Sequence, residues 1–275
     1  MLKNGVLSRD MDGGSMGTVA RAANVLRCVA EASDDICIKE IAERLSLAPS
    51  TVHRLLHLLI DQGLIERNPN APTYRAGAEL FRLGALVVNK TQLPKVALPY
   101  MRQLVEACDE FCMLNMYLPS EGCMMVVETL KASQQFDLAP PRYRRWSMLK
   151  GATGYAILAF LPEEDVRQIY DAAASVPRRD QQLPDFQVLM RVLETVRKKG
   201  YAHSVGHRAP GIAAFSSPIF GACGSVMGSF TVSLPEARYR PEREEILGKV
   251  AATFAGRISN ALGYRAAHPT RISAK

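Results

Sequence analysis

The sequence predicts an α+β protein built from two folding units, and three observations support this fold class. Its 275 residues exceed the usual size of one domain. Apolar residues at helical spacing recur in three stretches near the N-terminus and precede two short extended segments, whereas helical and extended patterns alternate from Pro94 onward. The 48% hydrophobic and 22% charged residues are ordinary for a globular protein and indicate neither a disordered nor a fibrous chain.

A first helix is predicted from Thr18 to about Ser33, because apolar residues recur there at intervals of three and four. These apolar positions are Val19, Ala22, Ala23, Leu26, Val29 and Ala30. Residues 1–15 are polar and glycine-rich, so we expect a disordered arm there, and we expect residues 266–275 to form a flexible tail.

Two more helices are predicted after a very short extended piece at residues 36–38. The second helix runs from Lys39 to about Leu45. The third begins at Pro49, because the fixed φ and missing N–H of proline suit a first helical turn, and Gly63 is a natural stop. Its apolar residues fall on one side, which comprises Val52, Leu55, Leu56 and Leu59.

Segments 64–67 and 73–75, separated by the Asn- and Pro-rich turn at 68–72, predict a two-stranded hairpin. Three short helices followed by a hairpin is the order of a winged helix-turn-helix, which we place at residues 16–76, with the third helix entering the DNA groove. Acidic and basic residues are equal in number across this segment. The formal net charge of +7 therefore does not by itself indicate DNA binding, and the prediction depends on the order of the elements.

Seven residues are candidates for contacts with double-stranded operator DNA. Five lie at the start of the third helix and two arginines flank the wing. The candidates are Pro49, Ser50, Thr51, His53, Arg54, Arg67 and Arg75. Arg54 could bond a phosphate or a guanine, and the wing arginines could touch the backbone or the minor groove. The alternative is a solvated helix face, together with wing arginines that only meet solvent.

Residues 77–93 continue as a helical pattern that is too short to form a domain. Its apolar positions are Leu80, Leu83, Leu86 and Val87. We expect a linker helix that can pack against its twin in a second copy of the chain. A two-fold symmetric DNA-binding protein then requires a palindromic or pseudopalindromic operator.

Residues 94–265 are predicted to form the larger unit, with a mixed, mainly antiparallel sheet, because glycine-containing turns such as 221–224 join neighbouring strand patterns. The predicted helices are 95–110, 152–160, 162–173, 185–199 and 240–264. The predicted strands are 112–118, 123–130, 201–205, 212–219 and 225–234.

No apolar run is long enough to cross a bilayer and the N-terminus lacks a secretory pattern, so we expect a cytoplasmic, nucleoid-associated protein with no membrane partner. The six cysteines lack a regular framework, and Cys108 and Cys112, although four residues apart, are interpreted with the others as packing residues. His203 and His207 have the spacing of a helical metal site. Their glycine-containing surroundings instead indicate strand and loop, so neither a metal nor another cofactor is expected.

An enzyme is the main alternative class of protein. The sequence contains neither a G-x-S-x-G elbow, nor a phosphate-binding loop, nor a strand-borne G-x-G-x-x-G. We therefore expect no catalytic residues. A metal-responsive regulator is a third class, which elemental analysis of the purified protein would reveal.

The segment IKEIAERLSLAPSTVHRLLHLLIDQGLIER at 38–67 resembles the DNA-binding half of IclR-family regulators, and TYRAG at 73–77 is similar to the Y-R-L-G that usually ends the wing in that family. Three further segments resemble the family in order and spacing. They are GYAILAFLPEE at 154–164, KKGYA at 198–202 and PGIAAFSSPIF at 210–220. The resemblance covers the chain from about residue 16 to residue 265.

This resemblance implies a GAF-like effector-binding domain, a homodimer or dimer of dimers, and a repressor or activator that responds to a small catabolic metabolite, often aromatic or carboxylated. Carried over by position, it implies an effector pocket walled by Trp146, Ala152, Thr153, Ser204, Ala214, Thr231 and Ser233. His203 and His207 stand nearby and are further candidates. Ser204 and Ala214 occupy places where relatives often carry an acid and a cysteine, and Tyr155 replaces a usual lysine. We therefore expect the effector to differ from that of any one relative.

The stretch RYRRW at 142–146 allows three interpretations. Arg142, Arg144 and Arg145 could clamp an anionic ligand, contact another subunit or form a solvated charged loop. Trp146 is better explained as an aromatic wall of the pocket.

Overall fold

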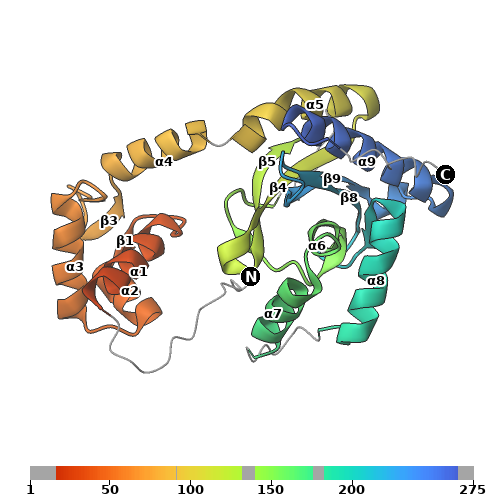
Figure 1. Ribbon diagram of the computed structural model, residues 1–275. Helices are drawn as coiled ribbons and strands as arrows, with labels where there is room; N and C mark the ends of the chain where they lie inside the picture. Colours follow the sequence, from red (N-terminus) through yellow and green to blue (C-terminus); the bar gives the residue numbers. More distant parts are fainter. Residues whose placement is uncertain (1–16, 91, 132–139, 176–182, 266–275) are drawn as a thin grey trace. The chain divides into compact units, whose positions relative to one another are not determined.

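The computed structural model describes residues 17–90, 92–131, 140–175 and 183–265. The chain divides into two compact units, with the boundary between Thr91 and Gln92 (Figure 1). The arm predicted at 1–15 and the tail predicted at 266–275 lie outside the described residues. The two units, one mainly helical and one with a six-stranded sheet, confirm the predicted α+β class.

The first unit contains three helices, a small sheet and a fourth helix. Its elements are α1 Thr18–Ala30, β1 Ile36–Cys37, α2 Ile38–Leu45, α3 Pro49–Asp61, β2 Ile65–Arg67, β3 Thr73–Ala76 and α4 Ala78–Lys90. The strands pair antiparallel in the order β1-β3-β2. The first helix ends at Ala30, three residues before the predicted end near Ser33, and Glu31 forms its C-cap in a turn. The second begins at Ile38, where Cys37 and Glu40 form a capping box.

Helix α3 is held by the apolar face that its sequence predicts. Pro49 occupies its first turn, and Val52 and Leu55 have no solvent-exposed surface. The link from α2 to α3 turns at Ser46, whose φ of 52° lies in the left-handed region and bends the chain sharply enough to set one helix across the other. The core of this unit combines residues of α1, α2, α3 and the hairpin, and the polar side of α3 is left outside it.

Helix α4 starts against the hairpin at a position that only glycine can fill. A Cβ on Gly77 would lie 2.2 Å from the carbonyl oxygen of Gly63, which is far too close for a real contact. This close approach lets the Gly77 amide donate to Leu64 and the Glu79 amide donate to Gly63. The predicted linker at 77–93 therefore corresponds to α4 together with the first residues of a new helix that begins at Gln92.

The second unit is a six-stranded sheet with helices on both faces. Its elements are α5 Gln92–Cys108, β4 Phe111–Leu118, β5 Cys123–Leu130, β6 Arg145–Trp146, α6 Gly151–Leu158, α7 Glu163–Ala174, α8 Phe186–Lys199, β7 Ala202–Val205, β8 Ile212–Phe220, β9 Val226–Pro235 and α9 Glu244–Ala261. The strand order is β6-β5-β4-β9-β8-β7, and every strand pair among the described residues is antiparallel. The prediction of a mainly antiparallel sheet is confirmed.

Helices lie on both faces of this sheet (Figure 1), and an apolar core lies on each face. Helices α5 and α9 pack on one face, where Phe215 and Phe230 are fully buried. Helices α6, α7 and α8 contribute to the other core. Since neighbouring residues of a strand point to opposite faces, β7, β8 and β9 each present one set of side chains to α9 and another to α6. The set that faces α6 is rich in serine and threonine.

None of the helices in the described ranges is both long and apolar enough to cross a membrane. The longest, α9, carries four charged side chains at Glu244, Glu245, Lys249 and Arg257.

Candidate nucleic-acid interface and ligand site

The N-terminal half of α3 presents its polar residues on the side opposite the core. Ser50, His53 and Arg54 are exposed and Thr51 is partly exposed. The rings of His53 and His57 lie edge to face with centroids 4.5 Å apart, so they form one aromatic edge along the helix. No ion pair to Arg54 occurs in the part of the chain that the structure describes. This helix can therefore bring hydroxyl, imidazole and guanidinium donors to an anionic surface without first breaking a salt bridge.

The wing differs in how it holds its two candidate arginines. The Arg75 Nε lies 2.6 Å from the Glu66 Oε1 on the neighbouring strand, and both side chains are about half exposed. Arg67 is exposed and takes part in no ion pair within the described ranges. A shallow hollow of about 520 Å³ runs along the turn and is lined by Arg67 and residues 68–72. Of the two arginines, Arg67 is thus available to a partner and Arg75 is engaged within the sheet.

The turn of the wing is fixed by side-chain hydrogen bonds. The Asn68 Nδ2 donates to the Asp35 Oδ2 at 2.7 Å, and the Asn70 amide donates to the Asn68 Oδ1 at 2.9 Å. Asp35 lies between α1 and β1. The wing turn is therefore tied to the body of the first unit.

In the second unit, six of the seven predicted effector residues come together between α6 and the sheet. Ser204, Ala214 and Ser233 lie side by side across β7, β8 and β9. The amide of Ala152, in the first turn of α6, donates to the Ser204 Oγ at 3.0 Å. These contacts give a polar seam that lies between the start of a helix and three strands.

The remaining two residues of this group meet deeper in the seam. The hydroxyl oxygens of Thr153 and Thr231 are 3.4 Å apart, and both residues are buried. The Ser233 Oγ is buried and has no hydrogen-bond partner among the described residues. A buried hydroxyl without a partner is uncommon, and a bound polar molecule would satisfy it.

Three polar residues of this seam were not predicted. The Asn115 Nδ2 donates to the Thr231 Oγ1 at 3.2 Å, the hydroxyls of Ser216 and Thr231 are 2.8 Å apart, and the Ser229 Oγ donates to the Thr153 carbonyl at 3.2 Å. The signal was present in the sequence, because Ser229, Thr231 and Ser233 alternate with apolar residues along one strand. Alternation of this kind places all three on one face of the sheet.

The seventh predicted residue, Trp146, lies in β6 at the other edge of the sheet, opposite Met124 of β5. It packs with the core on the α6 side, and its Nε1 is buried without a hydrogen-bond partner among the described residues. The guanidinium carbon of Arg208 lies 5.5 Å from the centroid of its ring. Sequence reasoning missed Arg208, because this residue stands in the loop between β7 and β8, where no periodic pattern marks it.

The arginines of segment 142–146 separate into two kinds. Arg142 forms an ion pair with Glu128, and Arg145 forms one with Glu121. The guanidinium carbon of Arg144 instead lies 5.0 Å from the centroid of the Trp146 ring. Arg142 and Arg145 thus hold neighbouring segments at the edge of the sheet. Of the three arginines in this segment, Arg144 is the one beside the Trp146 indole.

His203 and His207 are not brought into the polar seam. His203 points to the opposite face of the sheet, where its ring stacks on Phe215 at a centroid distance of 4.9 Å and its Nδ1 lies 3.6 Å from the Glu244 Oε2. Burial lowers the pKa of this imidazole, which favours the neutral ring. His207 is exposed in the following loop. The period of two along β7 separates His203 from Ser204, and the proximity of the histidines in sequence was misleading. Across the described ranges, no cluster of three metal-binding side chains occurs.

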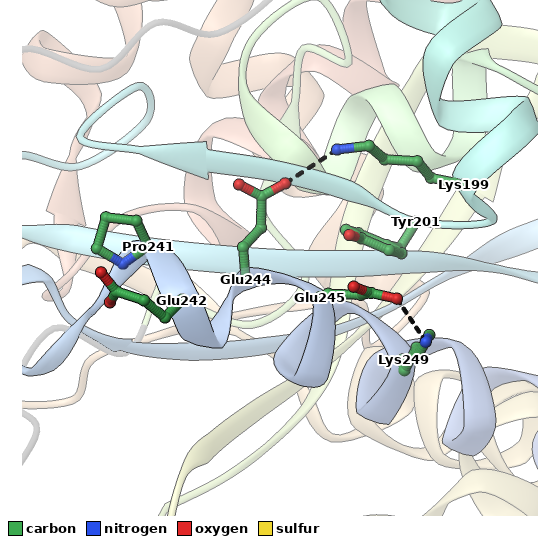
Figure 2. Close-up of a pocket in the computed structure, with 7 residues that line it drawn as sticks. All are labelled: Lys199, Tyr201, Pro241, Glu242, Glu244, Glu245 and Lys249. Atoms are coloured by element: carbon green, nitrogen blue, oxygen red, sulfur yellow. Dashed lines mark hydrogen bonds and ion pairs between the residues drawn. The ribbon is translucent and has the colours of Figure 1, made fainter.

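A surface hollow of about 480 Å³ lies elsewhere in this unit, beside the start of α9 (Figure 2). It is lined by Lys199, Tyr201, Pro241, Glu242, Glu244, Glu245 and Lys249. The Lys199 Nζ lies 3.0 Å from the Glu244 Oε1, and Lys249 pairs with Glu245. Its lysines are already paired with carboxylates and none of the predicted effector residues lines it. The polar seam is therefore the better candidate ligand site.

Comparison with known families matches almost the whole described chain in two parts. Residues 18–69 match the family model described as the IclR helix-turn-helix domain. Residues 85–260 match the model described as the C-terminal domain of the bacterial transcriptional regulator IclR. The two matches cover the candidate recognition helix and the polar seam respectively.

Individual proteins agree with these matches. The HTH-type transcriptional regulator BhcR of Paracoccus denitrificans is 26% identical over 248 residues, covering 90% of this chain and 88% of that protein. The HTH-type transcriptional regulator KdgR of Escherichia coli is 24% identical over 250 residues, covering 91% and 94% of the two chains. Both are named as regulators and not as enzymes.

Solved structures show the same fold. A putative IclR transcriptional regulator from Silicibacter superposes with a TM-score of 0.76 at 22% identity, covering 90% of this chain and 97% of that chain. An IclR homologue from Microbacterium hydrocarbonoxydans, solved in complex with 4-hydroxybenzoate, superposes with a TM-score of 0.74 at 21% identity, covering 90% and 99%.

Proposed function

The chain belongs to the IclR family of bacterial transcriptional regulators, and from this premise we propose that α3 and the wing contact operator DNA while the polar seam around α6 binds a small organic effector. The protein is a ligand-responsive DNA-binding regulator of the helix-turn-helix type. The assignment of α3 rests on the separation of its two faces. Val52 and Leu55 are fully buried on one face, whereas Ser50, His53 and Arg54 are exposed on the other. Such a helix can enter a major groove without losing its own core.

A gel-shift experiment with DNA from upstream of the protein's own gene tests this function. Sequence-specific retardation that changes when a small acid is added supports the regulator. Turnover of that acid, followed by product analysis, would instead indicate an enzyme. Elemental analysis of the same preparation tests the metal-responsive alternative.

We further propose a homodimer, or a dimer of such dimers, that acts in the cytoplasm on the nucleoid. The support is the apolar surface of α4, where Phe81 is 80% exposed and Leu83 and Leu86 are also exposed. Leu83 and Leu86, three residues apart, lie on the same side of the helix, and exposed apolar side chains in such an arrangement are typical of a surface that a partner covers. A two-fold dimer would place two α3 helices in grooves one helical turn, or a multiple of it, apart.

For the effector, we propose a small aromatic or carboxylated catabolic metabolite. The regulated genes would then be those that encode the use or breakdown of this metabolite. The hydroxyl-rich seam supports a polar ligand, and the 4-hydroxybenzoate complex of the Microbacterium homologue shows that this fold can hold an aromatic acid. Thermal-shift screening with aromatic and aliphatic acids would identify the class.

Replacing Arg54 with alanine is expected to weaken operator binding by about 5- to 150-fold, because one charge-assisted contact to a base or phosphate is worth roughly 1–3 kcal/mol. Affinity would be measured by fluorescence anisotropy at several salt concentrations. Arg191→Ala, which removes an exposed arginine from α8, is the matched control and should bind as the unaltered protein does. An Arg54 variant with unchanged affinity and unchanged salt dependence would contradict the assignment of α3.

Substituting serine for Leu83 or Leu86 is expected to reduce the effect of effector on operator affinity while leaving effector affinity within about twofold. Coupling between two sites is typically about 5- to 150-fold and depends on how each ligand favours one arrangement of the protein. Calorimetry measures effector affinity, and fluorescence anisotropy measures operator affinity with and without the effector. Arg82→Ala on the same helix is the control, because Glu79 of α4 is the ion-pair partner of Arg82 among the described residues. Equal loss of effector affinity and response would argue against a coupling role for α4.

A further inference from the structure

Arg208 is a cation whose partners in the second unit leave its charge uncompensated. Its Nη2 donates to the Ser147 carbonyl at 2.8 Å and to the Lys150 carbonyl. Its Nε is buried and has no hydrogen-bond partner among the described residues. Within the same ranges no carboxylate forms an ion pair with it. A largely buried guanidinium whose partners are two carbonyls and the face of an indole ring still lacks a negative charge, and an anion would compensate it.

The electrostatic surroundings support the need for an anion. Burial lowers the pKa of Arg208 to about 10, and the neighbouring Tyr155 hydroxyl only partly opposes this effect. At neutral pH the group is still charged. Within the described ranges, the folded protein therefore keeps a positive charge in this place with no carboxylate paired to it.

The side chain of Arg208 extends from the loop between β7 and β8 to the first turn of α6, beside the polar seam. A side chain on Gly151, the first residue of α6, would meet the Cβ of Arg208 at 3.5 Å, the Ser204 Oγ at 3.6 Å and the Arg208 Nε at 3.8 Å. The unpartnered Nε thus lies next to the first turn of a helix, where the backbone amides carry partial positive charge. A helix N-terminus and a free guanidinium edge together favour a carboxylate or a similar planar anion.

Trp146 completes the surroundings of this guanidinium. Arg208 and Arg144 both lie over its ring, at 5.5 Å and 5.0 Å from the centroid. The buried Trp146 Nε1 is a second donor that has no acceptor in the part of the chain that the structure describes. Two unsatisfied donors beside a large apolar surface fit a ligand that combines oxygen acceptors with a small hydrocarbon or aromatic body.

We propose that Arg208 is the residue that selects acids as effectors, by binding the carboxylate of a small organic acid at the first turn of α6 while Trp146 contacts the body of that acid. This inference rests on the proposed effector role of the polar seam. It adds that the ligand is negatively charged and that Arg208 recognises this charge. The competing possibility is a purely structural cross-link, in which Arg208 only joins its loop to the carbonyls of Ser147 and Lys150.

The chain carries its own reporter for the test, because Trp146 is its single tryptophan. Tryptophan fluorescence of the full-length protein would be titrated with benzoate, 4-hydroxybenzoate, pyruvate and succinate, and in parallel with the corresponding neutral amides. We expect a saturable change with at least one acid and at least tenfold weaker binding of its amide. If every acid fails to change the fluorescence, or if an amide binds as well as its acid, the proposal is overturned.

Arg208→Gln removes the charge but keeps a polar amide donor at the position of the arginine Nε. It is expected to weaken binding of the selected acid by about 10- to 100-fold and to leave binding of the amide unchanged. Arg142→Gln removes an arginine that is already paired with Glu128 and should change neither affinity. A purely structural role would weaken acid and amide alike, and that result would overturn the proposal.

Two measurements keep the result interpretable. Arg208→Lys retains the charge, so it should recover acid selectivity over the amide even if Arg208→Gln is poorly folded; a lysine variant without selectivity contradicts the proposal. Operator binding without any acid should be unchanged in every variant that folds. If the unaltered protein selects acids but binds no DNA, the proposed function fails while the assignment of Arg208 stands.

Discussion

Leu55→Ala is expected to destabilise the first unit by about 2–5 kcal/mol and to abolish most operator binding at 37 °C. Leu55 has no exposed surface and belongs to the core that joins α1, α2, α3 and the hairpin. Truncation to alanine removes buried methyl groups and leaves a cavity, and both effects add to the loss. A unit of some seventy residues has only about 4–10 kcal/mol of folding free energy, so this loss is a large part of the total.

The same helix supplies the control for this substitution. Leu58 is 47% exposed, and Leu58→Ala should change stability by about 0.5 kcal/mol or less. Urea unfolding followed by far-ultraviolet circular dichroism would measure both variants, and anisotropy would measure DNA binding. Equal destabilisation by the two substitutions would mean that α3 does not bury the face described for it.

Gly154→Ala is expected to destabilise the second unit by about 3 kcal/mol or more. A Cβ at this position would lie 2.1 Å from the Met148 carbonyl oxygen and 2.5 Å from its carbonyl carbon. Because both obstacles are backbone atoms, no rotamer change relieves the overlap, and α6 would have to move away from residue 148. That movement would also displace Ala152 and Thr153, so binding of an effector in the seam should fail.

Gly256→Ala is the matched control, since a Cβ there meets nothing within 4 Å and the residue is exposed in the middle of α9. Alanine is favoured over glycine in a helix interior, so this variant should be more stable by about 0.5–1 kcal/mol. Thermal unfolding followed by Trp146 fluorescence would compare the two. An equally stable Gly154→Ala protein would show that α6 does not approach residue 148 as closely as described.

The first unit could be predicted almost completely because its physical signals are local. The apolar period of α3 and the proline at its first turn identify the helix, its start and its buried face. The Asn- and Pro-rich turn at 68–72 similarly indicates where the two strands of the hairpin are joined. The end of α1 was misplaced by three residues, because Glu31, Ala32 and Ser33 differ little in helical preference from the residues before them.

The ligand site was harder to predict because it depends on long-range pairing. Strand β6 has two residues, too few for any periodic pattern, so the sequence could not show that Trp146 adds to the sheet. Arg208 reaches the carbonyls of residues about sixty positions earlier, which no local pattern encodes. The opposite orientations of His203 and Ser204, in contrast, follow from the alternation of strand residues and could have been deduced once β7 was recognised.

The short edge strand β7 also bears on how this protein avoids self-association through its sheet. It covers β8 from Ala213 to Ser216, and Pro218 stands in β8 two residues beyond this paired stretch. Proline has no amide hydrogen to offer an incoming strand. Addition of strands from other copies at this edge of the sheet is therefore disfavoured. We expect copies of the chain to associate through helical surfaces and to remain free of fibrils at concentrations where an open β edge would promote them.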